Sequence, residues 1–153
     1  ICAGVKTQEF RNKFGDNFRI YPVKGYSITI DLHDEISRNA APYVSIKDDN
    51  SKIVSSRLGN RLRVAGTAEL AGENKEIRKE RITPLVEWVN DCFPEINTDN
   101  FITWAGLRPM TSDMVPVMRE SKRKNVFYNS GHGHLGWTMA AFAAKFISDL
   151  IED

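Results

Sequence analysis

The chain has 153 residues, of which 41% are hydrophobic, which is enough for a well-packed domain and unlike a disordered, collagen-like or repetitive protein. Its 21 Lys and Arg residues are almost balanced by 20 Asp and Glu residues, so the formal net charge is +1. A nucleic-acid-binding protein needs clustered positive charge to neutralise phosphates, so this composition argues against nucleic acid as a partner.

The two cysteines, Cys2 and Cys92, do not fit the disulfide framework of a small secreted protein, so we expect a reducing compartment. The longest apolar stretch contains Lys145 and Asp149 and is shorter than the roughly 20 residues that cross a bilayer, which predicts a soluble protein without a transmembrane segment. Because Ile1 opens a strand-like ICAG rather than a leader sequence, we expect the chain to begin in the middle of a fold.

In the N-terminal half, residues 7–14 are predicted to form a short helix that Gly15 ends. Residues 21–30 alternate β-forming side chains around Gly25, which predicts a strand with a bulge or a close backbone approach at that glycine. The short turns that follow leave no room for crossover helices, so the next strands are predicted to form an antiparallel meander. These strands are expected at 43–47, 52–57 and 61–67.

In the C-terminal half, residues 74–93 carry one apolar stripe and are predicted to form a helix. Thr83 and Pro84 have the chemistry of a helix start, which leaves open a kink or a second start there. The apolar stripe of the last helix is expected to lie against a sheet. Extended segments are predicted at 101–110, 115–118 and 125–129, and the last helix at 139–151.

The glycines of GHGHLGWT, residues 131–138, spell GxGxxG between a strand-like and a helix-like segment. The nucleotide-binding form of this motif needs an acidic residue about 20 positions later and a further parallel strand, for which the chain leaves no room. What is left is a glycine turn that brings the N–H groups of a helix start towards an electron-rich ligand atom. The motif therefore predicts a cofactor contact that does not involve the nucleotide half.

Arg108 lies among the apolar residues Trp104, Leu107 and Met110, where a guanidinium can bind a carboxylate with two parallel hydrogen bonds. This environment predicts a substrate anchor. An internal ion pair with Asp113, or an ordinary surface position, is the alternative interpretation, and the spacing of the residues does not decide between them.

Other candidates are weaker. His132 and His134 have the spacing of some metal ligands, but no third ligand is near them in the sequence, so no metal site is predicted. Tyr26 could line a pocket or pack across strands, and Glu69 has the same two interpretations. The sequence contains no GxSxG, CxxC or HExxH motif, so no catalytic residue is predicted.

Four segments in order carry a resemblance to a known family. Together they resemble the C-terminal portion of the D-amino acid dehydrogenase small-subunit family, a branch of the FAD-dependent oxidoreductases related to D-amino acid oxidase and glycine oxidase. The pairing of GLRPMT with GHGHLGWT at this separation is more specific than either motif alone. The segments are YPVKGYSITI at 21–30, RLRVAGTAEL at 61–70, FITWAGLRPMTSDMVPV at 101–117 and NVFYNSGHGHLGWTMA at 125–140.

The resemblance implies an α+β fold: an antiparallel substrate-binding sheet with flanking helices, plus terminal pieces of a truncated FAD-binding α/β domain. It implies a remnant of the FAD-binding domain at 1–20, the substrate-binding sheet domain at 21–118, and a return to the FAD-binding domain at 119–153. Two residues depart from the family pattern. Ser112 stands where a proline is usual, and Arg119 stands where a glycine is common.

The resemblance also implies site residues. Arg108 matches the arginine that binds the substrate carboxylate, and Tyr26 matches a position on the substrate side. The reaction of the family oxidatively deaminates a D-amino acid to a 2-oxo acid and ammonia, which needs positioning rather than a protein nucleophile. The implied contacts to FAD are Gly4, Gly131, His132, Gly133, His134, Leu135, Gly136, Trp137 and Thr138.

The leading hypothesis is therefore the C-terminal part of a flavin-dependent D-amino acid dehydrogenase, which we expect to be inactive alone and not to bind FAD tightly by itself. The alternatives are a stand-alone carboxylate-binding module, a partner subunit that completes a split oxidoreductase with an N-terminal FAD-binding polypeptide, and an inactive relic. The resemblance implies a cytoplasmic location, with peripheral association of the complete protein with the inner membrane.

Overall fold

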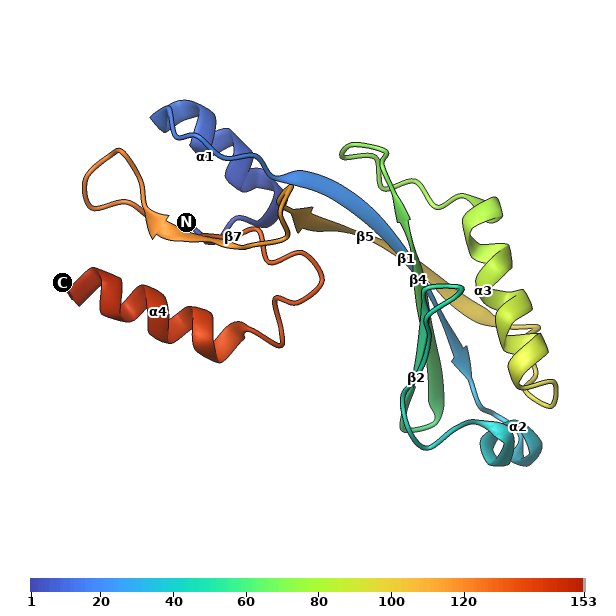
Figure 1. The fold of residues 1–153 in the computed structure, drawn as a ribbon. Helices are drawn as coiled ribbons and strands as arrows, with labels where there is room; N and C mark the ends of the chain where they lie inside the picture. The colour runs from blue at the N-terminus through green and yellow to red at the C-terminus, as the bar shows by residue number, and fades with distance from the viewer. Residues whose placement is uncertain (153) are drawn as a thin grey trace. The chain divides into compact units, whose positions relative to one another are not determined.

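The computed structural model describes residues 1–152, which form two compact units (Figure 1). The terminal unit comprises Ile1–Val23, Leu70–Glu73 and the chain from Leu107 onwards, and the sheet unit comprises Lys24–Glu69 and Asn74–Gly106. An antiparallel sheet with flanking helices confirms the predicted α+β class. The predicted domain boundaries at residues 20 and 118 stay a prediction.

The larger sheet has the strand order β2-β3-β4-β1-β5. The pairs β2–β3 and β3–β4 are antiparallel, which confirms the predicted meander, and β4 also pairs antiparallel with β1. The register of β1 on β4 shifts between Lys24 and Tyr26, so the predicted irregularity at Gly25 is present. The bounds are β1 Tyr21–Asp31, β2 Ile46–Asp48, β3 Ile53–Leu58, β4 Arg61–Glu69 and β5 Phe101–Met110.

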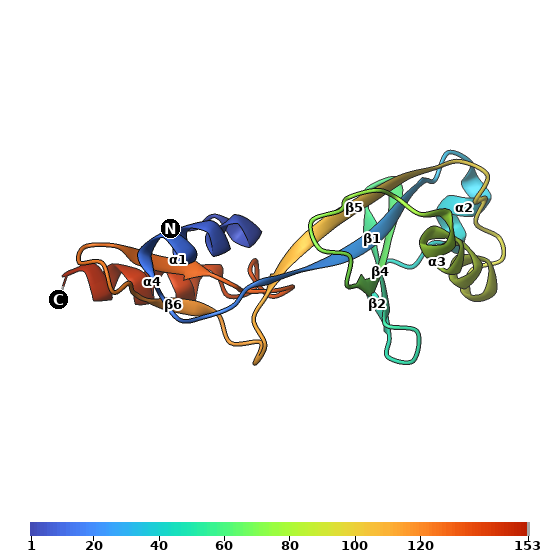
Figure 2. The same cartoon turned by 90° about the horizontal axis from the view of Figure 1, so that it is seen from above.

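One face of this sheet is covered by helix α3, Lys79–Cys92, which runs alongside the strands in Figures 1 and 2. Leu85 packs closely at Gly66 of β4, where an added Cβ would lie 3.1 Å from the Leu85 Cδ2 atom. The apolar stripe predicted for this helix is thus the surface that makes the core. The buried residues of the helix are Ile82, Leu85, Trp88 and Val89, and they meet Tyr26, Ile28, Ile30, Leu62 and Val64 of the strands.

Helix α3 starts five residues later than predicted. The side chain of Asn74 accepts a hydrogen bond of 2.7 Å from the Glu76 backbone N–H, and this local turn competes with helical geometry. The helix does not restart at Pro84, which lies inside one continuous helix. The Thr83 hydroxyl donates to the Lys79 carbonyl at 3.1 Å instead of capping a second helix.

The prediction missed helix α2, Glu35–Ala40, because it is only six residues long. Its start is marked by Asp34, whose Oδ1 accepts a 2.7 Å hydrogen bond from the Ser37 N–H, the usual chemistry of an N-cap. The next strand was predicted at 43–47, but β2 begins at Ile46. The Asp34 cap was the sequence signal that could have revealed the helix.

The terminal unit contains helix α1, Thr7–Phe14, which ends as predicted at Gly15 in the left-handed conformation (φ 71°). Helix α4, Ala140–Glu152, packs on the antiparallel hairpin formed by β6, Val117–Glu120, and β7, Phe127–Ser130, as Figures 1 and 2 show. This confirms the prediction that the last helix lies against a sheet. None of the helices formed by residues 1–152 has the length and apolar character needed to span a membrane.

A buried carboxylate ties α1 to the hairpin. Asp16 is 5% exposed and accepts hydrogen bonds from the hydroxyls of Ser121 at 2.5 Å and Tyr128 at 2.8 Å and from the Lys122 N–H at 2.8 Å. Burial alone would raise the pKa of Asp16, but these three donors together hold it below its ordinary value. The segment after α1 is thereby fixed against β7.

Candidate functional site

The two motifs singled out in the sequence lie side by side in the terminal unit. Met110, at the end of β5, forms an antiparallel bridge with His132, and the Gly133 N–H donates to the Pro109 carbonyl at 2.9 Å. Arg108 is two residues before Met110 on the same strand, and alternate residues of a strand face the same side. The structure therefore joins the predicted carboxylate anchor to the predicted cofactor loop.

Two of the loop glycines are required by both conformation and space. Gly131 and Gly133 have φ values of +81° and +57°, which side chains rarely adopt. A Cβ on Gly131 would lie 2.9 Å from Thr111 Cγ2, and one on Gly133 would lie 2.5 Å from Met110 Sδ. Met110 and Thr111 of GLRPMT thus pack directly on the backbone of GHGHLGWT.

The loop passes through further turns before α4 begins. The Leu135 N–H donates to His132 O at 3.0 Å, and the Met139 N–H donates to Leu135 O at 2.9 Å. Helix α4 begins at Ala140, one residue after the predicted start at Met139, so the glycine loop leads into the helix as the sequence predicted. The side chains of Leu135 and Trp137 are exposed, Trp137 almost completely.

Gly4, the other predicted cofactor contact, is held next to the start of this loop. Its carbonyl accepts a 3.3 Å hydrogen bond from the hydroxyl of Ser130, the last residue of β7. The start of the chain lies along β7, since the Asn129 N–H donates to the Ile1 carbonyl at 3.0 Å. Residues 1–3 do not form the strand that the sequence predicted, and a short 3-10 helix covers Gly4–Lys6. Gly4, the loop from Gly131 and the end of β5 therefore belong to one region of the terminal unit.

The electrostatics of this region favour an anionic or electron-rich ligand. Arg108 is half-buried, and burial lowers the pKa of its guanidinium, although an arginine stays charged at any physiological pH. Burial also lowers the pKa of His132, and its Nε2 is buried without a hydrogen-bond partner among residues 1–152. The positive charge of the half-buried guanidinium favours an anionic or electron-rich ligand over a cation.

Tyr26 belongs to the sheet unit and is 1% exposed. Its hydroxyl donates a 2.6 Å hydrogen bond to Glu69, whose carboxylate also pairs with Lys24 at 3.0 Å. Arg78 and Arg81 approach the other oxygen of Glu69 at 3.3 and 3.4 Å. The Tyr26 hydroxyl, followed by Lys24, lowers the pKa of Glu69 to about 2. Tyr26 thus lines an ionic network, and its predicted contact with substrate stays a prediction.

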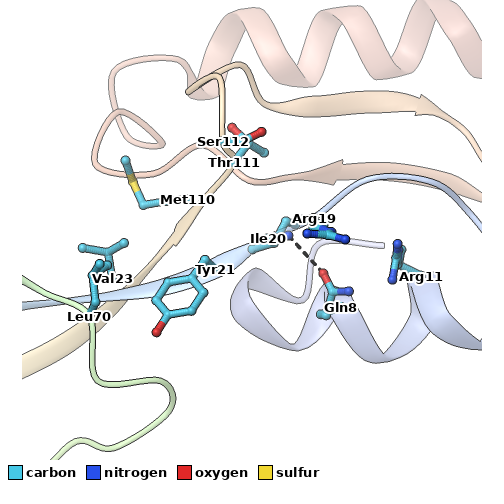
Figure 3. Close-up of a pocket in the computed structure, with 10 residues that line it drawn as sticks. All are labelled: Gln8, Arg11, Arg19, Ile20, Tyr21, Val23, Leu70, Met110, Thr111 and Ser112. Atoms are coloured by element: carbon cyan, nitrogen blue, oxygen red, sulfur yellow. Dashed lines mark hydrogen bonds between the residues drawn. The ribbon is translucent and has the colours of Figure 1, made fainter.

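The sequence did not reveal a cavity of about 570 Å³ in the terminal unit, shown in Figure 3. Its apolar wall includes Tyr21, Val23, Leu70 and Met110, and Arg11 and Arg19 also line it. Tyr21, Val23, Leu70 and Met110 lie in three of the four segments that carry the family resemblance, but nothing in the sequence shows that these segments meet one another and Arg11 and Arg19 around a cavity. Among residues 1–152, no group of three or more His, Cys, Asp or Glu side chains is arranged to hold a metal ion.

Comparison with known proteins identifies the family. Residues 1–150 match the family model described as DAO, FAD dependent oxidoreductase. The chain belongs to this family. The resemblance inferred from the GLRPMT and GHGHLGWT motifs is thereby confirmed.

Curated relatives carry a more specific name. The chain is 50% identical over 152 residues to D-amino acid dehydrogenase 3 of Mesorhizobium japonicum, covering 99% of this chain and 37% of the relative. It is 44% identical over 153 residues to the D-amino acid dehydrogenase of Xanthobacter autotrophicus, covering 98% of this chain and 35% of the relative. The chain therefore spans little more than a third of the length of these relatives.

Solved structures share the fold. Glycine oxidase from Bacillus cereus superposes with a TM-score of 0.84 at 24% identity, covering 99% of this chain and 42% of that chain. Iminodiacetate oxidase from Chelativorans superposes with a TM-score of 0.86 at 20% identity, covering 99% of this chain and 41% of that chain. L-alpha-glycerophosphate oxidase from Mycoplasma pneumoniae, solved with FAD bound, superposes with a TM-score of 0.80 at 18% identity, covering 99% of this chain and 42% of that chain.

Proposed function

We propose that this chain provides the carboxylate-binding strand and the flavin-contacting loop of an FAD-dependent D-amino acid dehydrogenase. The observation that carries the proposal is the direct connection of the end of β5 to the loop, through the Met110–His132 bridge and the Gly133–Pro109 hydrogen bond. The names of the relatives that are 50% and 44% identical support the choice of D-amino acids as substrates.

In this proposal Arg108 binds the α-carboxylate of the substrate. Arg108 lies two residues before Met110, which contacts the glycine loop at His132. A carboxylate bound by Arg108 is therefore proposed to lie close to that loop. The guanidinium supplies two parallel donors to one carboxylate, which fixes the orientation of the substrate as well as its affinity. Holding the α-carbon in one place contributes most of the catalysis that a protein can supply to this reaction, since no nucleophile is needed.

The loop residues fit a flavin for a structural reason. Positive φ values at Gly131 and Gly133 set the course of the loop backbone. Thr111 and Met110 occupy the side on which side chains of these glycines would lie, so the flavin is proposed to meet the peptide groups that face away from them. Bound FAD supplies the hydride acceptor for the α-carbon, and the resulting imino acid hydrolyses to a 2-oxo acid and ammonia.

We also propose that the adenosine half of FAD is held outside this chain, by another part of the same polypeptide or by an associated one. The GxGxxG of the loop follows β7, a strand of an antiparallel hairpin, whereas the dinucleotide-binding form of the motif lies in a parallel βαβ unit. A cytoplasmic location, with peripheral contact to the inner membrane, stays a prediction that cell fractionation tests.

The test is a hybrid enzyme in which this chain replaces the matching segment of D-amino acid dehydrogenase 3 from Mesorhizobium japonicum. We expect the purified hybrid to be yellow and to reduce an artificial electron acceptor when D-alanine is added, and not when L-alanine is added. A hybrid that binds FAD but oxidises no D-amino acid, beside a parent enzyme that does, would contradict the proposal.

A further inference from the structure

The cavity of the terminal unit has two chemically different ends. Figure 3 shows Val23, Leu70 and Met110 on one side, Arg11 and Arg19 on the other, and the ring of Tyr21 between them. Its volume of about 570 Å³ lies within the range of small-molecule sites in proteins. A ligand that fills it therefore meets an apolar surface along one part of its length and positive charge along another.

The charge of the cavity is not balanced by its own walls. Among residues 1–152, the side chains that line it include two arginines and no aspartate or glutamate. Arg11 donates through NH1 to the Asn12 side chain at 2.8 Å, and Asn12 is neutral. A cationic pocket of this kind favours an anion over a neutral or cationic molecule of the same shape.

Two buried polar atoms in the cavity wall have no hydrogen-bond partner within the described residues. These atoms are Nε of Arg11 and Oγ1 of Thr111, and Thr111 is 9% exposed. Because both atoms are shielded from the space inside the cavity, a ligand contacts them only if their side chains rotate, so the argument for an anionic ligand rests on the cavity and its two arginines.

Contacts within the chain hold the residues of the cavity wall in place. The backbone N–H of Ile20 donates to the Gln8 side chain at 3.0 Å, which ties the segment carrying Arg19 and Tyr21 to helix α1. Met110 is pinned on the other side by its packing on Gly133. The cavity is therefore formed by elements that are fixed on both sides.

We propose that this cavity is a binding site for an organic monocarboxylate with an apolar body, whose acid group meets Arg11 and Arg19 and whose body contacts Val23, Leu70 and Met110. The inference shares Met110 with the proposed function but does not use Arg108, so octanoate binding and D-amino acid oxidation by the hybrid enzyme can each fail without the other. It assigns the chain a second ligand site, for acids that lack the ammonium group of an amino acid.

Octanoate is the probe. The protein contains four methionines, so labelling their methyl groups with ¹³C gives four NMR signals, and the Met110→Leu variant identifies the one that reports on the cavity. We expect submillimolar octanoate to shift the Met110 signal and to leave that of the exposed Met114 unchanged. Octylammonium, with the same chain and the opposite charge, is expected to bind at least tenfold more weakly.

Substitutions test the charged end. The variants Arg11→Gln and Arg19→Gln should each weaken octanoate binding about tenfold, because each removes one charged donor. Arg61→Gln, at an exposed arginine of β4 outside the cavity, is the matched control and should bind octanoate as the parent does. Circular dichroism of each variant establishes that it is folded.

Three results would overturn the proposal. The Met110 signal could stay in place at millimolar octanoate, which would show that the cavity takes no such ligand in the protein. Octylammonium could bind as well as octanoate, which would show a purely apolar site. The two arginine variants could bind like Arg61→Gln, which would remove the charged end from the site.

Discussion

The substitution Tyr26→Phe removes one hydroxyl from the network around Glu69 and leaves the ring in place. Tyr26 is 1% exposed, and its hydroxyl donates to a carboxylate oxygen of Glu69 at 2.6 Å. Because the ring volume is kept, the change opens almost no cavity. The main loss is therefore the short hydrogen bond to a charged acceptor, beside a long one of 3.4 Å to the Glu76 carbonyl.

Hydrogen bonds to charged groups contribute about 1.5–3 kcal/mol to stability, so the variant should be less stable by this amount. For a protein of this size, that loss lowers Tm by roughly 3–12 °C. The difference should depend on pH with a definite sign. The folded pKa of Glu69 is about 2, below its ordinary value of 4.5, so the stabilisation is full above pH 4.5 and is lost as pH falls towards 2.

The assay is urea denaturation of the two proteins at pH 7 and at pH values down to 2. Tyr43→Phe is the matched control, because Tyr43 is 82% exposed and its substitution should change stability by less than about 0.5 kcal/mol. The reasoning fails if Tyr26→Phe behaves like Tyr43→Phe at pH 7. It also fails if the stability difference is as large at pH 2 as at pH 7.

Three further predictions concern the terminal unit and helix α3, each read from denaturation curves. Asp16→Asn should destabilise the protein by about 1.5–3 kcal/mol, because it weakens three hydrogen bonds to a buried carboxylate, and an unchanged midpoint would refute this. Gly133→Ala should cost more than Gly72→Ala, since both have positive φ but only Gly133 is crowded by Met110; equal losses would contradict the contact. Pro84→Ala should stabilise the protein by about 1–3 kcal/mol, because an exposed proline inside α3 removes a helical hydrogen bond, and destabilisation would count against this.

Elements with strong local signals were predictable from the sequence. Helix α1 ends at Gly15, because a glycine adopts the left-handed conformation that ends a helix with little strain. Strand β5 matches its predicted bounds, Phe101–Met110. The irregularity of β1 followed from Gly25. The predicted start of α3 at residue 74 was wrong, because the Asn74 side chain forms a local turn with the Glu76 N–H that the apolar periodicity of the segment does not reveal.

Contacts between distant segments were not predictable in the same way. The hydrogen bond of Tyr26 joins it to a residue 43 positions away, and alternation along a strand does not say which partner a buried hydroxyl finds. The cavity likewise combines α1, the start of β1, Leu70 and the end of β5. The connection of Arg108 to the glycine loop was expected only because both motifs occur together in a known family.

The central claim is that Arg108 anchors the substrate next to the glycine loop. The most direct measurement is the KM for D-alanine of the hybrid enzyme carrying Arg108→Gln, determined together with its FAD content. The account predicts a KM raised roughly a hundredfold with the FAD content unchanged, because a bidentate charged contact is lost while the loop is kept. An Arg108→Gln hybrid with the KM of its parent would contradict it.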